Sequence, residues 1–159
     1  TAGAAGMVLV KDLGADVVID YRSQDFAAVL RDCDVVLNSQ DAATLAKSVR
    51  VTRAGGQLIS TSGPPDPAFA RDIGASGLVR LVIGLLSLGI RRKAKARGVH
   101  YSFLFMKADG AQLQAITCLI EEGAIRPVVD RVFPFESTPE ALAYADTGRA
   151  KGKVVIRMK

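Results

Sequence analysis

The most constraining feature of this chain is a regular alternation of short apolar runs with helix-like segments and turn residues. Val17–Ile19, Val35–Leu37 and Leu58–Thr61 are short runs rich in β-branched or aliphatic residues, and we interpret each as a buried strand. The order strand, helix, strand, helix, strand predicts parallel strands joined by crossover helices. Strands that are continuously apolar, rather than alternating, also indicate a sheet covered on both faces.

After residue 66 the alternation of strand-like and helix-like segments changes. Residues 67–97 predict helix and loop, with an apolar run from Leu78 to Ile90 that is too short to span a bilayer. Strands are then expected over Val99–Met106, Val128–Phe133 and Lys153–Met158. Two helices lie between these strands, and we expect Asp109 and Thr138 to cap them, with Pro139 at the first helical position of the second and Gly123 and Gly148 at their ends. The turn at residues 53–56 is expected to separate the helix before it from the third strand.

Charge and ligand-forming residues exclude several classes of function. The net charge of +5 comes from one basic cluster that contains no acid, and the charges of the rest of the chain cancel. The cluster consists of Arg91, Arg92, Lys93, Lys95 and Arg97. We therefore expect no nucleic-acid partner, since such proteins commonly spread basic residues over a surface. Cys33, Cys118 and His100 are too few for a structural zinc site, so no metal ligand is assigned. The start of the sequence has no basic-then-apolar leader, and a cytoplasmic location is expected.

Polar residues directly follow the three predicted parallel strands, at Asp20–Arg22, Asn38–Asp41 and Thr61–Pro64. Ligands of open α/β sheets bind beyond the carboxyl ends of the strands, so these segments predict a nucleotide-type site. The pattern would equally suit any doubly wound domain. No nucleophile elbow or acid–base pair accompanies it, so we assign no catalytic residue.

Several motifs, taken in order, resemble one family over nearly the whole chain. The motifs are Leu13–Asp16, Val18–Arg22, Asp34–Leu37, Ala54–Ser60, Gly63–Pro65, Tyr101–Met106, Gly123–Val128 and Gly148–Val155. Each is weak alone, but the ordered set is similar to the zinc-less medium-chain dehydrogenases/reductases, and within them to NADP-dependent quinone-oxidoreductase-like members. The resemblance implies hydride transfer from NADP(H) to a quinone, enone or related small carbonyl substrate.

The resemblance also implies a fold and a division into domains. Residues 1–126 would form an incomplete Rossmann-type doubly wound parallel sheet, with residues 67–97 as a helical and basic insertion. Residues 127–159 would be strand–helix–strand elements that return to a GroES-like catalytic domain. By this comparison the first Rossmann strand and its Gly-rich loop are not in the sequence, and no G-x-G-x-x-G motif occurs in it. We therefore expect this fragment to be inactive alone.

Cofactor-binding positions follow from the resemblance, residue by residue. Gly3 would lie beside the adenosine ribose, where NAD-dependent members place an acid, so its lack of a side chain favours NADP(H). Tyr21 would pack near the 2′-phosphate, and Arg22 would supply charge. Asn38 would follow the next strand, although the paired glycines usual there are replaced and Asp41 adds a negative charge. The alternative for Tyr21 and Arg22 is an ordinary solvated strand end.

The remaining positions would lie towards the nicotinamide. Ser62 and Gly63 match the loop beside it, and the backbone of Phe103, Leu104 and Phe105 matches the strand near its amide. On the pattern alone the two phenylalanines are core residues. Lys153 matches the lysine of the closing Gly-Lys-Val motif, or else it is a surface lysine.

Two further questions stay open at this level. Residues 78–97 could form a lid over the substrate, a helix that docks on a partner subunit, or a basic amphipathic anchor at a membrane surface, the last being least favoured. The alternative to an oxidoreductase is a non-catalytic binding or interaction module that dimerises through a half-Rossmann sheet. Because an unpaired sheet edge promotes association, a homo-oligomer is expected in either case.

Overall fold

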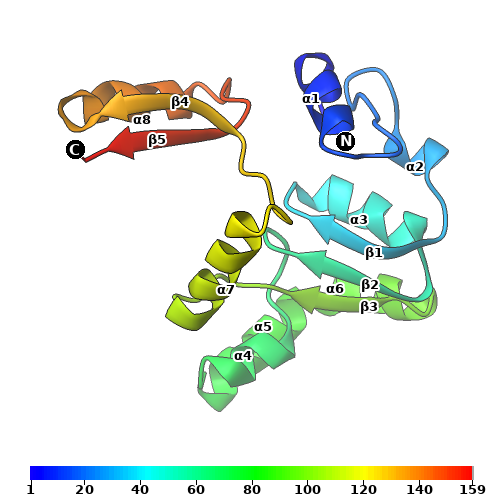
Figure 1. Ribbon diagram of the computed structural model, residues 1–159. Coiled ribbons are helices and arrows are strands. Elements are labelled where there is room, and N and C mark those ends of the chain that lie inside the picture. Colours follow the sequence, from blue (N-terminus) through cyan, green and yellow to red (C-terminus); the bar gives the residue numbers. More distant parts are fainter. Residues whose placement is uncertain (159) are drawn as a thin grey trace. The chain divides into compact units, whose positions relative to one another are not determined.

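The computed structural model describes residues 1–158 and divides the chain into two compact units (Figure 1). The first unit is Thr1–Met106 and the second begins at Lys107. This division comes 20 residues before the family domain boundary expected after residue 126, which stays a prediction. Each unit is described by itself.

The first unit consists of three strands, six α-helices and one 3₁₀ helix. Its elements in chain order are η1 (Ala4–Gly6), α1 (Met7–Asp12), α2 (Phe26–Val29), β1 (Cys33–Asn38), α3 (Ala42–Val51), β2 (Thr52–Ser60), α4 (Pro67–Asp72), α5 (Gly77–Leu86), α6 (Leu88–Ala96) and β3 (His100–Phe103).

The strands of the first unit form one parallel sheet in the order β1-β2-β3. Val36 of β1 pairs with Leu58 of β2, which in turn pairs with Tyr101 of β3. Helices α3 and α6 are the crossovers, and both lie on the same side of the sheet (Figure 1). The predicted parallel pairing with a crossover helix is therefore confirmed for the strands expected at Val35–Leu37 and Leu58–Thr61.

The core of this unit lies between the sheet and these two helices. Leu58 is fully buried at its centre, among Leu45, Val49, Ala94 and Val99. The opposite face of β1 is not covered, because Val35 and Leu37 are 61% and 67% exposed. The expectation that both faces are covered is therefore wrong for the residues described. Side chains alternate along a strand, so an apolar run buries only the face that has a layer of structure against it.

The prediction of a strand over Val17–Ile19 is also wrong, because the structure has only an isolated bridge there. Only Ile19 is buried, and pairing is limited to one parallel bridge between Ala2 and Asp20. Ala2 donates to the carbonyl of Ile19 at 3.0 Å and accepts from Tyr21 at 3.4 Å. A strand is defined by its ladder, and here the partner segment contributes a single residue to it.

Residues 53–56 continue β2 instead of forming the predicted turn. Gly55 adopts a positive φ of 76°, and the register between β1 and β2 shifts between Cys33 and Val35. A Cβ on Gly56 would lie 2.9 Å from the carbonyl oxygen of Asp34, so the strands approach closely there. The two glycines therefore allow an irregular strand, which sequence patterns do not separate from a turn.

The second unit contains α7 (Gly110–Glu121), β4 (Val129–Pro134), η2 (Phe135–Ser137), α8 (Thr138–Asp146) and β5 (Lys153–Arg157). Strands β4 and β5 are parallel, which confirms a strand–helix–strand arrangement. Asp109 caps α7 by accepting from the amides of Ala111 and Gln112, as predicted. Gly123 and Gly148 have positive φ after α7 and α8. Thr138 is the first residue of α8 rather than its cap, because the cap position falls on Ser137.

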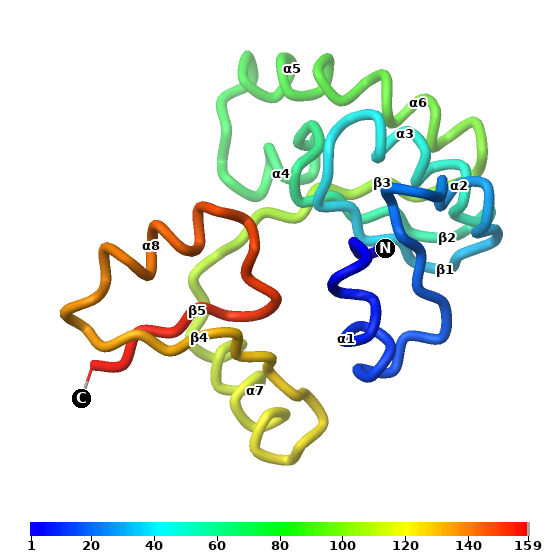
Figure 2. Tube along the Cα trace, turned by 90° about the horizontal axis from the view of Figure 1, so that it is seen from above, coloured from blue at the N-terminus to red at the C-terminus, as the bar shows by residue number. Residues whose placement is uncertain are grey.

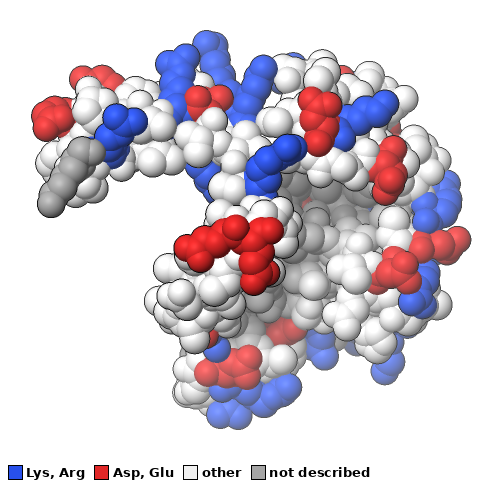
Figure 3. All heavy atoms as spheres, in the orientation of Figure 1, with Lys and Arg blue, Asp and Glu red and all other residues white. Residues whose placement is uncertain are grey.

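Surface charge and helix length complete the description. On the face shown in Figure 3, acidic and basic side chains are interspersed with uncharged surface. Within residues 1–158, no helix has the length and apolar character that crossing a bilayer requires.

Candidate functional site

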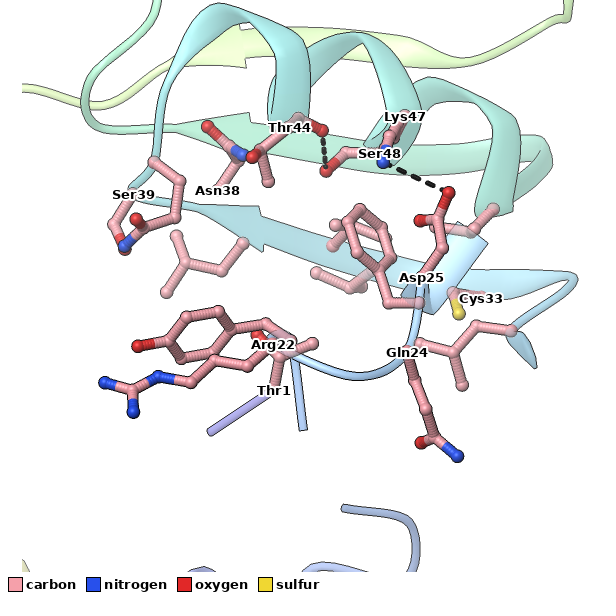
Figure 4. Close-up of a pocket in the computed structure, with 18 of the residues that line it drawn as sticks. Thr1, Arg22, Gln24, Asp25, Cys33, Asn38, Ser39, Thr44, Lys47 and Ser48 are labelled. Carbon is pink, nitrogen blue, oxygen red and sulfur yellow. Dashed lines mark hydrogen bonds and ion pairs between the residues drawn. The ribbon is translucent and has the colours of Figure 1, made fainter. Parts of the chain in front are cut away.

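A groove of about 920 Å³ lies along the edge of β1 in the first unit (Figure 4). One wall is formed by Thr1 and the segment from Tyr21 to Phe26, and the other by residues 33–40. Thr44 and Lys47 of α3 also line it. The groove thus extends along the strand to its carboxyl end, where the sequence predicts a ligand.

Tyr21 and Arg22 belong to this wall, and Gly3 lies next to Tyr21 without lining the groove itself. A Cβ placed on Gly3 would lie 3.6 Å from the ring and hydroxyl of Tyr21, an ordinary contact distance, so the phenol packs beside this glycine. The guanidinium carbon of Arg22 lies 5.8 Å from the centre of the Tyr21 ring, within cation–π range. Among the residues described, no ion pair involves Arg22, so its charge is available to a ligand.

The second cation at the groove is already paired. Lys47 Nζ lies 3.0 Å from the Asp25 carboxylate, and this contact lowers the pKa of Asp25, helped by the amide of Ala27. The pair bridges the α2 cap and α3 (Figure 4). Arg22 is therefore the cation at this groove best suited to an anionic ligand.

The carboxyl ends of the three strands converge, as parallel pairing requires. The amide of Thr61 donates to the carbonyl of Asn38 at 2.9 Å, and the amide of Leu104 donates to the carbonyl of Ser60 at 2.9 Å. Ser62 Oγ donates to the carbonyl of Gln40. Asn38 is buried, and its amide oxygen lies 3.5 Å from Ser60 Oγ. The structure thus brings Asn38 and Ser62 to the same edge.

Gly63 lies in a tightly packed turn after β2. Its amide donates to Ser60 Oγ at 2.9 Å. A Cβ here would come within 2.7 Å of Ser60 Oγ and 2.8 Å of both Leu45 Cδ2 and the Tyr101 hydroxyl. Only glycine fits without displacing these atoms.

Phe103 ends β3 and Leu104 and Phe105 follow it, and the two phenylalanines pack with Phe69. The Phe69 centroid lies 5.1 Å from that of Phe103, nearly perpendicular, and 5.6 Å from that of Phe105. Phe105 remains 59% exposed and Leu104 55% exposed. The core interpretation therefore holds in part for Phe103 and not for Phe105.

At this edge α3 and α4 begin, and each is capped by the carboxylate of the aspartate at its N-cap position. Asp41 accepts from the Thr44 amide at 2.8 Å at the start of α3, and this hydrogen bond lowers the pKa of Asp41. Asp66 accepts from the Phe69 amide at 2.8 Å at the start of α4. Neither helix N-terminus is therefore open to a phosphate, although such termini are common anion sites.

Asp66 and Tyr101 are two residues that the sequence analysis did not single out. The buried Asp66 also accepts from the Phe103 amide at 3.2 Å, so one carboxylate joins α4 to β3. The Tyr101 hydroxyl donates to the Pro64 carbonyl at 2.7 Å, and desolvation raises the pKa of Tyr101 to about 12. Asp66 directly precedes Pro67, a helix-start signal that could have indicated its cap but not its reach to β3.

Lys153 belongs to the second unit, where it begins β5. Its amide donates to the Val128 carbonyl at 2.7 Å, and its side chain is exposed. Within residues 1–158, no cluster of three or more metal-ligand side chains occurs, and both cysteines are free thiols. The expectation that Lys153 faces a cofactor stays a prediction.

These features define an α/β protein whose parallel sheet gathers polar groups and a tyrosine–arginine pair at its carboxyl edge. The family model described as "Zinc-binding dehydrogenase" matches residues 13–156. The chain therefore belongs to this family, the medium-chain dehydrogenases/reductases, and is similar to its quinone-oxidoreductase-like members.

Curated relatives support the assignment by sequence. The chain is 32% identical over 160 residues to the bovine and to the human protein named "NAD(P)H oxidoreductase RTN4IP1, mitochondrial", covering 94% of this chain and 39% of each relative. It is 28% identical over 158 residues to the tomato 2-methylene-furan-3-one reductase, covering 98% of this chain and 32% of that protein. The chain thus spans about two fifths or less of these relatives' length.

Solved structures show the same fold. A quinone oxidoreductase from Coxiella burnetii superposes with a TM-score of 0.73 at 18% identity, covering 99% of this chain and 44% of that one. An NAD-dependent alcohol dehydrogenase gives a TM-score of 0.72 at 22% identity, covering 99% and 43%. At these identities the likeness shows the α/β fold and its parallel sheets alone.

Proposed function

We propose that this chain is part of an NADP(H)-dependent oxidoreductase that reduces a quinone, an enone or a related small carbonyl compound. The nicotinamide would supply the hydride, while the protein binds and orients the cofactor. The chain would contribute the adenosine side of that site from an incomplete Rossmann sheet, and β4, α8 and β5 would belong with a GroES-like domain. We propose no catalytic residue, and we expect no turnover by these residues alone.

The groove beside Gly3, Tyr21 and Arg22 is the observation that carries this proposal. A 2′-phosphate needs a positive charge and no acid at the ribose position: Gly3 carries no carboxylate and Arg22 supplies the charge, while the nearby Asp20 carboxylate accepts from the Arg22 amide at 3.0 Å. Named relatives include an "NADPH-dependent alkenal/one oxidoreductase, chloroplastic" of Arabidopsis thaliana, at 27% identity over 158 residues.

The rest of the cofactor fits less well. Asp41 and Asp66 cap α3 and α4, so a pyrophosphate would meet a carboxylate at the N-terminus of each of these two helices. Asp41 also adds negative charge close to Asn38. We therefore expect weak binding, governed by the 2′-phosphate contact.

Nuclear magnetic resonance with two small probes tests the proposal. Adenosine 2′,5′-bisphosphate should shift the amide signals of Gly3, Tyr21 and Arg22, and adenosine 5′-monophosphate should shift them far less. The variant Arg22→Ala should weaken binding of the bisphosphate by about tenfold, the worth of one charge-assisted contact. The matched control Arg71→Ala changes an exposed arginine on α4 and should have no effect. Equal response to both probes, or shifts away from the groove, would refute the proposal.

A second candidate function is an interaction module. The open edge of β1 and the exposed side chains of Val35 and Leu37 favour pairing with another chain, since an unpaired strand is a template for association. We propose homo-oligomer formation through this edge, which also borders the groove. A cytoplasmic location is likewise proposed, although similar proteins carry "mitochondrial" or "chloroplastic" in their names.

A further inference from the structure

Helices α5 and α6 form a nearly continuous rod along the outside of the first unit (Figure 2). Ser87 lies between them and keeps helical dihedral angles. Its amide donates to the Ile83 carbonyl at 3.1 Å, and its carbonyl accepts from the Arg91 amide at 3.0 Å. Hydrogen bonds of the helical type thus flank the junction, although the helix is interrupted at Ser87, and α6 runs on in nearly the same direction as α5 (Figure 2).

The inward side of this rod is fixed by burial. Ser87 and Ala94 are 0% and 1% exposed, and Ala94 belongs to the core cluster with Leu58. Ile90 packs against the same cluster. Ser87, Ile90 and Ala94 are spaced three and four residues apart, so they share one stripe. The opposite side faces away from the core of the unit.

That opposite side of α5 is apolar and exposed. Leu78, Leu81, Val82, Leu85 and Leu86 are 73%, 60%, 47%, 61% and 66% exposed. Their successive spacings of three and one residues place them on one broad face at about 3.6 residues per turn. Arg80 is turned towards the helix start, where its Nε donates to the Ala75 carbonyl at 2.7 Å. We call this face, with its extension into α6, the α5–α6 outer face.

In α6 the same face becomes cationic. Arg92 and Lys93 follow Leu85 and Leu86 by seven residues each, which is about two turns, so they project from the same side. Both are exposed. No acidic residue occurs between positions 77 and 97. The α5–α6 outer face is therefore apolar over its first half and positively charged over its second.

We propose that the α5–α6 outer face docks in the plane of an anionic lipid surface. The leucines would enter the boundary between headgroups and acyl chains, and Arg92 and Lys93 would contact lipid phosphates. Charge complementarity favours this occupant, because the basic half of the face would meet anionic headgroups while the apolar half enters the acyl region. On sequence alone the membrane surface is the least favoured alternative. The exposure of one continuous face reverses that order, and this inference is independent of the proposed function.

Vesicle flotation of the chain tests the proposal. We expect the protein to float with vesicles of equal parts phosphatidylcholine and phosphatidylglycerol, much less with phosphatidylcholine alone, and less at high salt. Replacing Leu81 and Leu85 together by Gln should weaken binding about tenfold or more. Charge reversal by Arg92→Glu with Lys93→Glu should remove the preference for the anionic lipid.

Matched controls lie on the second unit. Leu113→Gln with Leu119→Gln changes two exposed leucines of α7, and Lys107→Glu with Arg157→Glu makes the same change of net charge. Both double variants should bind vesicles like the parent chain. Equal loss in the controls would show that binding is not a property of the α5–α6 outer face and would overturn the proposal.

A fluorescent reporter avoids dependence on the glutamine variants. The chain contains no tryptophan, so Leu85→Trp introduces a single probe. Its emission should shift to the blue on anionic vesicles and be quenched by brominated lipid, whereas Leu113→Trp should not respond. Absence of vesicle binding overturns the proposal. So does self-association that the paired Leu81 and Leu85 substitutions abolish without any vesicle binding, which would assign the face to a second copy.

Discussion

The hydroxyl of Tyr101 on β3 donates a 2.7 Å hydrogen bond to the carbonyl oxygen of Pro64, in the loop that follows β2. The contact joins the ends of two neighbouring parallel strands through a side chain. Because Tyr101 is partly buried, loss of its proton would place a negative charge in a poorly solvated position, and its pKa is raised to about 12.

This pKa predicts a pH dependence of stability. The folded state holds the Tyr101 proton more tightly than the unfolded state, whose pKa is near the ordinary 10.0. The contribution of this proton is therefore complete below pH 10 and is lost as the pH rises from 10 to about 12. Urea unfolding at several pH values should show that the free energy of unfolding falls over this range. In the Tyr101→Phe variant the fall should be smaller. An absorbance titration at 295 nm should lose its highest-pH phase in the same variant.

Replacing Gly63 by Ala should destabilise the first unit by about 1–3 kcal/mol, the usual cost of overpacking a filled site. The new methyl group would meet Ser60 and Leu45, which are both buried and have little room to move. The matched control is Gly84→Ala, which has open space around its Cβ position in α5. That variant should be more stable by up to about 1 kcal/mol, since alanine favours a helix interior. Thermal unfolding of both variants checks the contrast, and equal effects would contradict it.

Asp66→Ala should cost about 2–3 kcal/mol of unfolding free energy. The change removes the cap of α4 and leaves the Phe103 amide without its acceptor. Asp66→Asn keeps one carbonyl oxygen and should cost less. Hydrogen exchange should show faster exchange at both Phe69 and Phe103 in the alanine variant. If only Phe69 responded, the link from α4 to β3 would be disproved.

A feature of the fold could be predicted from the sequence where the residues that determine it are close together in the chain. Asp109 and the glycines at 123 and 148 mark helix ends through their own dihedral and hydrogen-bonding preferences, so the sequence locates α7 and α8 well. The parallel pairing of β1 with β2 likewise follows from the spacing of strands and helices.

Contacts that depend on tertiary placement could not be predicted. Asp66 and Phe103 are 37 residues apart, and nothing in either local pattern indicates their hydrogen bond. The apolar run at Val35–Leu37 shows the capacity to be buried, but not whether a second layer lies against it. For the site, the resemblance put Gly3 and Tyr21 near one ligand, and the structure shows them in contact range. It did not indicate that Asp41 and Asp66 close the helix termini.

In the second unit, Tyr144→Phe should raise the pKa of Asp130 towards its ordinary value. The Tyr144 hydroxyl donates to Asp130 at 2.6 Å, and this bond lowers the pKa of the carboxyl while raising that of the phenol. The Lys151 amide also donates to Asp130, so part of the depression should remain. A carbon-detected titration of Asp130 measures the change, and an unaltered pKa would contradict it.

The open edge of β1 leads to the last prediction, which concerns self-association. Val35 and Leu37 face solvent beside unpaired backbone groups, so light scattering should show a molecular mass that rises with protein concentration. Leu37→Lys should shift the chain towards the monomer, because a lysine on an edge strand opposes pairing with another copy. Leu142→Lys on α8 adds the same charge at a side chain of similar exposure and should leave association unchanged. A parent chain that stays monomeric at all concentrations would remove the basis for an interaction module at this edge, while the nucleotide groove could still be tested with the adenosine probes.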